Sequence, residues 1–124
     1  MIFIDSAVVE EVVRAVDLGF VWGCTTNPAL LAKVKEPPQT VIERLCKIVP
    51  GPVFYQLTGR TMVEKEQEAR EVYRITPEKI VLKIPATTEN LSLVTRLTPE
   101  IPCAATAVFS AHQTVLAVEA VVAM

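Results

Sequence analysis

Five short, largely apolar segments, separated by longer amphipathic ones, constrain the fold of this chain most strongly. The short segments cover residues 2–5, 20–25, 53–57, 80–84 and 103–109. Their length and composition are typical of strands, whereas the intervening segments have the apolar spacing of helices. Strands that alternate with helices predict an α/β fold, in which right-handed crossovers join the strands of a parallel sheet.

Helix-capping and helix-breaking residues predict where the helices begin and end. Ser6 is expected to cap a first helix over residues 7–18, and Pro28 to open a short helix. Two pairs have the spacing of a capping box, namely Thr61 with Glu64 and Ser110 with Gln113. The other boundaries are expected at Pro37 and Pro38, near residue 74, at residues 90 and 97, and near residue 122.

This order of elements fits either a (β/α) barrel or an open, doubly wound sheet. No glycine-rich phosphate loop follows the first strand, which counts against a dinucleotide-binding sheet. A complete barrel of eight βα units needs about 250 residues. Residues 1–124 are therefore predicted to be the N-terminal part of a single barrel domain, truncated after about five units. The unpaired fifth strand would favour self-association, so a homo-oligomer is expected.

The composition excludes several classes of protein. No apolar run approaches the roughly 18 residues that cross a membrane, and the first residues lack the basic segment of a secretory signal. A net charge of −2 without a basic stripe gives no indication of nucleic-acid binding. Three widely spaced cysteines and a single histidine, His112, predict neither disulfides nor a metal site. We expect a cytoplasmic protein without a cofactor, in which His112 is structural or solvent-facing.

Polar residues occur at the C-terminal end of every predicted strand, which is where (β/α) barrels place their chemistry. Each of them interrupts an otherwise apolar segment of the chain. They are Asp5, the segment Thr25-Thr26-Asn27, Gln56, Lys83 and Thr106. This pattern predicts a functional site at one end of the sheet, to which each strand contributes a side chain.

Lys83 is the strongest single candidate for chemistry. It lies between Leu82 and Ile84 in an apolar strand, where the cost of desolvating an ammonium favours the neutral amine. A neutral lysine amine can attack a carbonyl carbon. The alternative is an edge-strand lysine that faces water and prevents aggregation. The fourth of five strands is not an edge, which favours the functional interpretation.

The other candidates each have a structural alternative. Asp5 is a candidate general acid or base, or it caps the first helix jointly with Ser6. Asn27 binds a hydroxyl, or it tolerates a left-handed turn before Pro28. Gln56 serves a substrate or a neighbouring backbone group. Thr106 lies between two alanines that leave room for a ligand, although threonine is also an ordinary strand residue.

Four segments together resemble the transaldolase family, specifically the small subgroup that includes microbial transaldolases and fructose-6-phosphate aldolase. Their order and spacing fit throughout the chain. The segments are Phe3-Ile4-Asp5-Ser6, Gly23-Cys24-Thr25-Thr26-Asn27-Pro28, Val81-Leu82-Lys83-Ile84-Pro85 and Ala105-Thr106-Ala107-Val108. The resemblance implies a (β/α)8 TIM barrel and class I aldol chemistry on a sugar phosphate, without a metal or organic cofactor.

The resemblance also implies a role for each candidate residue. Lys83 corresponds to the Schiff-base lysine, and Asp5 to the carboxylate that acts as acid and base. Thr106 corresponds to the threonine that positions a catalytic water. Gln56 lies where transaldolases outside the small subgroup carry glutamate, and it cannot itself act as a base. The residues that correspond to the substrate-binding segment are Asn27, Thr25 and Thr26.

The function implied by the resemblance is transfer of a dihydroxyacetone unit between sugar phosphates, as transaldolases perform in the pentose phosphate pathway. Two alternatives stay open. One is fructose-6-phosphate aldolase activity, which releases free dihydroxyacetone. The other is an inactive, truncated barrel fragment.

Overall fold

The computed structural model of the chain describes residues 1–122, and its central feature is a single parallel sheet. The sheet has five strands in the order β1-β2-β3-β4-β5, so spatial order follows sequence order. The strands are β1 (Ile2–Asp5), β2 (Val21–Thr25), β3 (Val53–Gln56), β4 (Ile80–Pro85) and β5 (Cys103–Thr106). The predicted α/β fold with five βα units is thereby confirmed.

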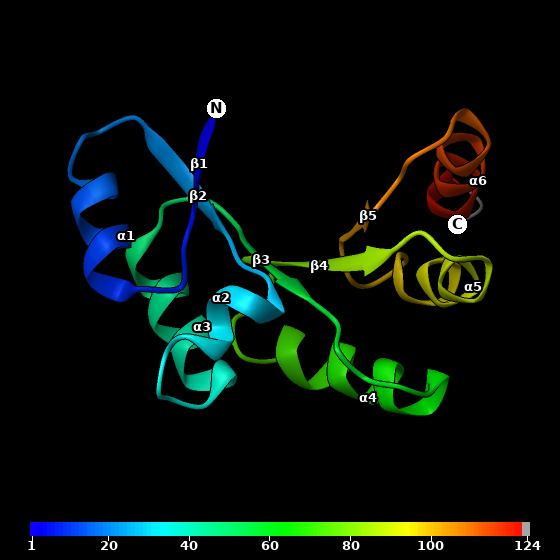
Figure 1. Ribbon diagram of the computed structural model, residues 1–124, viewed down its shortest axis with the longest axis horizontal. Helices are drawn as coiled ribbons and strands as arrows, with labels where there is room; N and C mark the ends of the chain where they lie inside the picture. The colour runs from blue at the N-terminus through cyan, green and yellow to red at the C-terminus, as the bar shows by residue number, and fades with distance from the viewer. Residues whose placement is uncertain (123–124) are drawn as a thin grey trace.

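The strand order distinguishes a barrel from an open, doubly wound sheet. A doubly wound sheet reverses its winding direction and carries helices on both faces. Here each right-handed crossover advances by one strand in the same direction, which places the helices on one side of the sheet. Figure 1 shows α1, α3, α4, α5 and α6 following one another around that side. This is the arrangement of a partial (β/α)8 barrel.

Helices α2, α4 and α6 begin where the sequence provides caps. Asn27 accepts a hydrogen bond from the Leu30 amide, and Thr61 forms the predicted capping box with Glu64. The Gln113 amide donates to Ser110 Oγ at 3.2 Å, as that pair's spacing predicted. The helices are α1 (Val9–Val16), α2 (Pro28–Ala32), α3 (Pro38–Ile48), α4 (Met62–Tyr73), α5 (Thr88–Leu97) and α6 (Ala111–Val122).

Several predicted boundaries are wrong: α1 covers Val9–Val16 rather than residues 7–18, α5 begins at Thr88 rather than residue 90, and β5 ends before residue 109. Helix α1 begins at Val9 rather than residue 7, because Ser6 Oγ accepts the Val8 amide at 3.0 Å and donates to Glu11 at 2.7 Å. Ser6 therefore closes the turn that precedes the helix. The fifth strand ends at Thr106 rather than residue 109, because Ala107 has φ 56° and leaves the extended conformation.

The hydrophobic core lies between the sheet and the helices. Alternate residues of each strand point to the helices, and in β4 these are Ile80, Leu82 and Ile84, each at most 1% exposed. Helices α3 and α5 meet them with buried leucines such as Leu45 and Leu97. The side chains on the helix-facing side of each strand therefore form the core. The other side chains of each strand point to the opposite face of the sheet, which we call the inner face.

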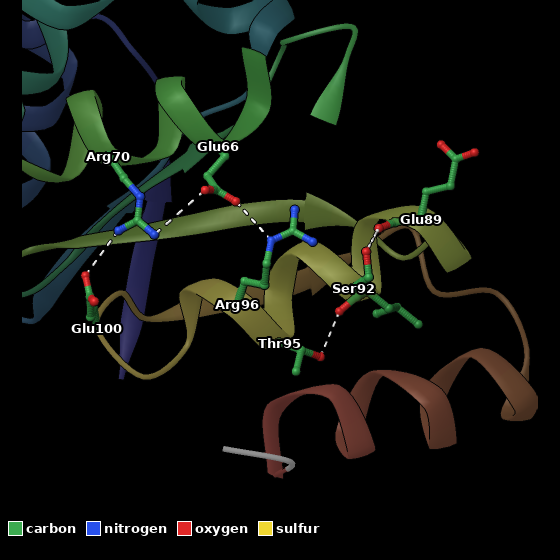
Figure 2. A network of polar contacts seen from close by, with 8 residues as sticks. Glu66, Arg70, Glu89, Ser92, Thr95, Arg96 and Glu100 are labelled. Carbon is green, nitrogen blue, oxygen red and sulfur yellow. Dashed lines mark hydrogen bonds and ion pairs between the residues drawn. The ribbon is translucent and has the colours of Figure 1, made fainter. Parts of the chain in front are cut away.

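Charged side chains join α4 to α5 on the outer surface (Figure 2). Arg70 pairs with Glu66 at 3.9 Å and with Glu100 at 3.1 Å, while Arg96 pairs with Glu66 at 3.0 Å. All four side chains are at least one-third exposed, so water screens these pairs and each contributes little to stability. The network links the two helices at their exposed surface.

A buried amide ties the same two helices to the end of β4. The Asn90 side chain is 4% exposed, and its Nδ2 donates to the Pro85 carbonyl at 2.9 Å. Its Oδ1 accepts a hydrogen bond from Lys65 Nζ at 2.7 Å. Since Pro85 follows Lys83 by two residues, this contact holds the C-terminal end of the lysine-bearing strand.

Replacing Asn90 with alanine is expected to lower the free energy of unfolding by about 1–3 kcal/mol, because the half-buried Lys65 amine and Pro85 carbonyl lose their partner. Ser92→Ala is the matched control on the same helix. Its exposed hydroxyl donates to the Glu89 carbonyl, so the change is expected to stay within about 0.5 kcal/mol. Urea unfolding of both variants measures the difference, and equal losses would contradict a special role for the buried amide.

Candidate functional site

The parallel register brings one polar side chain from each strand to the inner face. Side chains paired across neighbouring strands point to the same face, and along a strand they alternate. Asp5 pairs with Thr25, and Gln56 pairs with Lys83. Thr106 pairs with Pro85, which lies two residues beyond Lys83 and therefore on its face. Thr25 pairs with Phe54, which lies two residues before Gln56 and therefore on its face. One predicted residue from each strand consequently shares the inner face at the C-terminal end of the sheet, namely Asp5, Thr25, Gln56, Lys83 and Thr106.

Lys83 reaches across β3 toward the end of β2. It is half-buried, and its Nζ donates a hydrogen bond to the Thr26 carbonyl at 3.2 Å. Next-nearest strands of a flat sheet lie about 10 Å apart. The lysine and the segment after β2 must therefore converge over the inner face, which brings the amine close to the residues of the second strand.

The carboxylate of Asp5 is held by the same segment. Thr25 Oγ1 donates to Asp5 Oδ1 at 2.9 Å. The amine of Lys83 and the carboxylate of Asp5 are thus bound by consecutive residues, Thr26 and Thr25. Both side chains are therefore bound at the C-terminal end of β2, on the inner face of the sheet.

Thr26 and Asn27 use part of their polar groups for the fold. Thr26 is fully buried, and its Oγ1 donates to the Phe54 carbonyl at 2.7 Å. What Thr26 offers the site is therefore its own carbonyl. Asn27 Oδ1 caps α2 through the Leu30 amide at 2.9 Å, so its capping role is real. The Asn27 amide nitrogen makes no hydrogen bond with residues 1–122 and can donate to a ligand.

Gln56 and Thr106 flank Lys83 on the neighbouring strands. Both are half-buried, and neither side chain hydrogen-bonds within the described part of the chain. The carbonyl of Thr106 accepts the Ala86 amide at 2.8 Å, which joins the ends of β4 and β5. His112 is exposed on α6 and is not among the residues that the register brings together.

Sequence reasoning missed the side chain that organises the loop after β3. The Glu68 carboxylate accepts hydrogen bonds from Tyr55 Oη at 2.6 Å and from the amides of Thr58 and Gly59 at 2.9 Å. Burial, and then the nearby Glu68, raise the pKa of the Tyr55 phenol, so Tyr55 remains a donor. No local sequence pattern identifies Glu68, because its partners lie nine to thirteen residues away.

The Cys24 thiol lies beside the site but points to the core. It is fully buried, and its Sγ donates to the Ser6 carbonyl at 3.1 Å. Burial raises the pKa of this thiol from 9.0 to about 11. Cys24 therefore stays protonated at neutral pH and is no nucleophile there.

Two kinds of feature are absent from the described residues. Within residues 1–122, no group of three or more histidine, cysteine, aspartate or glutamate side chains could hold a metal ion. In the same range, every helix is too short or too polar to cross a membrane.

Comparison with known proteins identifies relatives along nearly the whole chain. The family model "Transaldolase/Fructose-6-phosphate aldolase" matches residues 2–124. A "Probable transaldolase" of Desulfotalea psychrophila is 40% identical over 119 residues, which are 95% of this chain and 55% of the relative. A "Probable transaldolase" of Clostridium kluyveri is 40% identical over 120 residues, covering 96% of this chain and 55% of the relative. The chain thus spans about half the length of the curated relatives it matches.

Cys24 is expected to resist alkylation by iodoacetamide at about pH 10, because its folded-state pKa of about 11 keeps it a thiol there. In urea the same cysteine, with its ordinary pKa of 9.0, should react rapidly at that pH. The raised pKa also predicts a loss of stability as pH rises from about 9 through 11, since only the unfolded thiol ionises in that range. Peptide mass spectrometry after timed labelling measures the reaction, and equal rates in the two states would refute the burial of this thiol.

Proposed function

The chain belongs to the transaldolase/fructose-6-phosphate aldolase family, and we propose that Lys83 performs aldol chemistry by forming an imine with the ketone of a sugar phosphate. One observation is the main support for this proposal. The Lys83 amine and the Asp5 carboxylate are held on the inner face by the consecutive residues Thr26 and Thr25. Because the chain covers about half of its curated relatives, the activity of the whole protein is part of the proposal.

The proposed reaction begins at the nitrogen of Lys83. The neutral amine adds to the ketone carbon, and a proton taken up from solvent allows water to leave, which gives an iminium. The iminium is an electron sink, so the electron pair of the C3–C4 bond moves toward it. Asp5 accepts the proton of the C4 hydroxyl, directly or through a water, as that bond breaks. An aldose leaves, and a three-carbon enamine of dihydroxyacetone stays on Lys83.

The remaining candidates bind and orient. The free amide nitrogen of Asn27 and the hydroxyl of Thr25 are proposed to hold the hydroxyls of the dihydroxyacetone unit. Thr106 is proposed to hold the water that exchanges protons with Asp5. Gln56 has no carboxylate, so it can orient a hydroxyl or a water but cannot take its proton. Each of these assignments remains a proposal that rests on placement at the strand ends.

The fate of the enamine decides the class of enzyme. We propose transaldolase-type transfer to an acceptor aldehyde, as in the pentose phosphate pathway and in the cytoplasm. An aldolase would instead protonate the enamine and release dihydroxyacetone. The relatives' names, which read "Probable transaldolase", support the first proposal.

Self-association is proposed as well, and exposed apolar side chains support it. On the β5 side of the sheet, Phe109 is 88% exposed, and Val115, Leu116 and Val118 of α6 are each at least 52% exposed. Apolar surface of this kind is typical of an interaction face. A homo-oligomer thus stays a prediction.

Treatment with dihydroxyacetone and borohydride is expected to add one reduced ketone to Lys83, because borohydride converts an imine to a stable secondary amine. Lys83→Met should abolish the adduct. Lys65→Met is the matched control, since Lys65 is a second half-buried lysine, and its Nζ binds the Asn90 side chain instead. Intact mass and peptide mapping measure the adduct. A folded wild-type protein without any adduct would favour the inactive fragment, and an adduct confined to other lysines would contradict the assignment.

Incubation with fructose 6-phosphate alone is expected to yield little free dihydroxyacetone. A transaldolase retains the enamine until an acceptor aldehyde binds, whereas protonation of the enamine would release dihydroxyacetone. Adding erythrose 4-phosphate should raise the release of glyceraldehyde 3-phosphate by about tenfold or more if the acceptor step limits turnover. Enzymatic assays for the two three-carbon products measure the outcome. Free dihydroxyacetone in equal amount to glyceraldehyde 3-phosphate, without an acceptor, would instead identify an aldolase.

A further inference from the structure

We propose that Thr26 is a positioning residue for Lys83, whose buried hydroxyl fixes the peptide that holds the lysine amine. The inference rests on the proposed function of Lys83 and adds a residue that acts through it. Thr26 itself is fully buried, so it acts on the lysine rather than on a substrate.

Two donors of Thr26 converge on one acceptor. Its amide donates to the Phe54 carbonyl at 3.1 Å, and its Oγ1 donates to the same carbonyl at 2.7 Å. The amide hydrogen bond alone would leave Thr26 free to turn about the Phe54 carbonyl, and the second hydrogen bond fixes its Cα and Cβ atoms relative to β3. The next residue, Asn27, is held by the Leu30 and Leu31 amides, so the peptide between Thr26 and Asn27 is fixed at both ends.

The acceptor of these bonds is itself held in place. Phe54 lies on the inner face opposite Thr25 in the register, and its ring packs edge-on against Phe3 with centroids 5.7 Å apart. A packed aromatic side chain on an interior strand gives the Phe54 carbonyl a fixed position. Thr26 is therefore braced against a rigid part of the sheet.

This bracing directs the Thr26 carbonyl to the amine of Lys83. The Nζ atom donates to that carbonyl at 3.2 Å, across the width of β3. A lysine side chain has several rotatable bonds, and ordering it costs up to about 2 kcal/mol. A carbonyl that is already in place orders one N–H of the amine before substrate arrives. The rest of the nitrogen then faces the inner face. Less of the activation free energy for imine formation goes into orienting the amine.

The test compares two substitutions that differ in a single group. Thr26→Val keeps the shape of the buried side chain and removes the hydroxyl, whereas Thr26→Ser keeps the hydroxyl and removes a methyl. Thr95→Val on α5 controls for the loss of a threonine hydroxyl away from the strand ends. Thr95 Oγ1 also donates to a backbone carbonyl, that of Leu91 at 3.0 Å. Circular dichroism first shows that each variant is folded. Trapping with cyanoborohydride then measures the maximal rate of imine formation and the dihydroxyacetone concentration at half-saturation.

Thr26→Val is expected to lower the maximal trapping rate by about tenfold, because the Thr26 carbonyl loses its brace and holds the Lys83 amine less firmly, and weakening a hydrogen bond to an amine changes a rate by about this factor. The half-saturating concentration should stay within about twofold, since substrate hydroxyls are bound elsewhere, and Thr26→Ser should stay close to wild type. Thr95→Val should lower stability alone. An unchanged maximal rate in Thr26→Val, or an equal loss in Thr26→Ser and Thr26→Val, overturns the proposal. Thr26→Ala removes the same hydroxyl and replaces the valine variant if the latter does not fold.

A second measurement separates this inference from the proposed function. Timed acetylation with acetic anhydride reports how freely each lysine amine reacts, without any imine chemistry. Release of the anchor in Thr26→Val should raise the acetylation of Lys83 by about threefold relative to Lys79, while imine trapping falls. If wild type forms no imine, the proposed function fails and the acetylation ratio alone decides whether Thr26 anchors the amine. An acetylation ratio equal to that of wild type refutes the anchor.

Discussion

The parallel register of the strands is the constraint on which the candidate site depends. Because side chains alternate along a strand, β4 sends Leu82 and Ile84 to the helices and Lys83 to the inner face. A shift of one residue would exchange these faces and bury the ammonium among leucines without a partner, at a cost of several kcal/mol. The hydrophobic core thereby determines where the amine lies, and the same argument places Asp5 and Gln56 beside it.

Local signals explain why much of the fold could be predicted from the sequence. The ends of β1 and β2 agree with prediction because Ser6 and Asn27 interrupt apolar segments with groups that cap or close turns. The capping box at Thr61 has a fixed spacing and was confirmed for the same reason. The inner-face placement of Lys83 followed from its position between two residues that had to be buried. Each of these inferences uses information from within a few residues.

Contacts between distant segments explain what could not be predicted. Thr26 was predicted to bind substrate, yet its hydroxyl reaches Phe54 and its carbonyl reaches Lys83, 57 residues away. A backbone carbonyl is the same chemical group at every position, so no residue type signals such a partner. The Glu68 carboxylate was missed because its partners become neighbours only when the loop after β3 folds back on α4. Polar groups that hold other residues in place are thus harder to predict from a sequence than the side chains that face the site.

A crystal structure of the protein after reduction with dihydroxyacetone and borohydride tests the central claim most directly. We predict continuous electron density from Lys83 Nζ to a three-carbon ligand on the inner face, with ligand hydroxyls within hydrogen-bonding distance of the Asp5 carboxylate and the Asn27 amide. A Lys83 side chain that extends into bulk water, or a ligand bound remote from the ends of β1 and β2, would contradict the account.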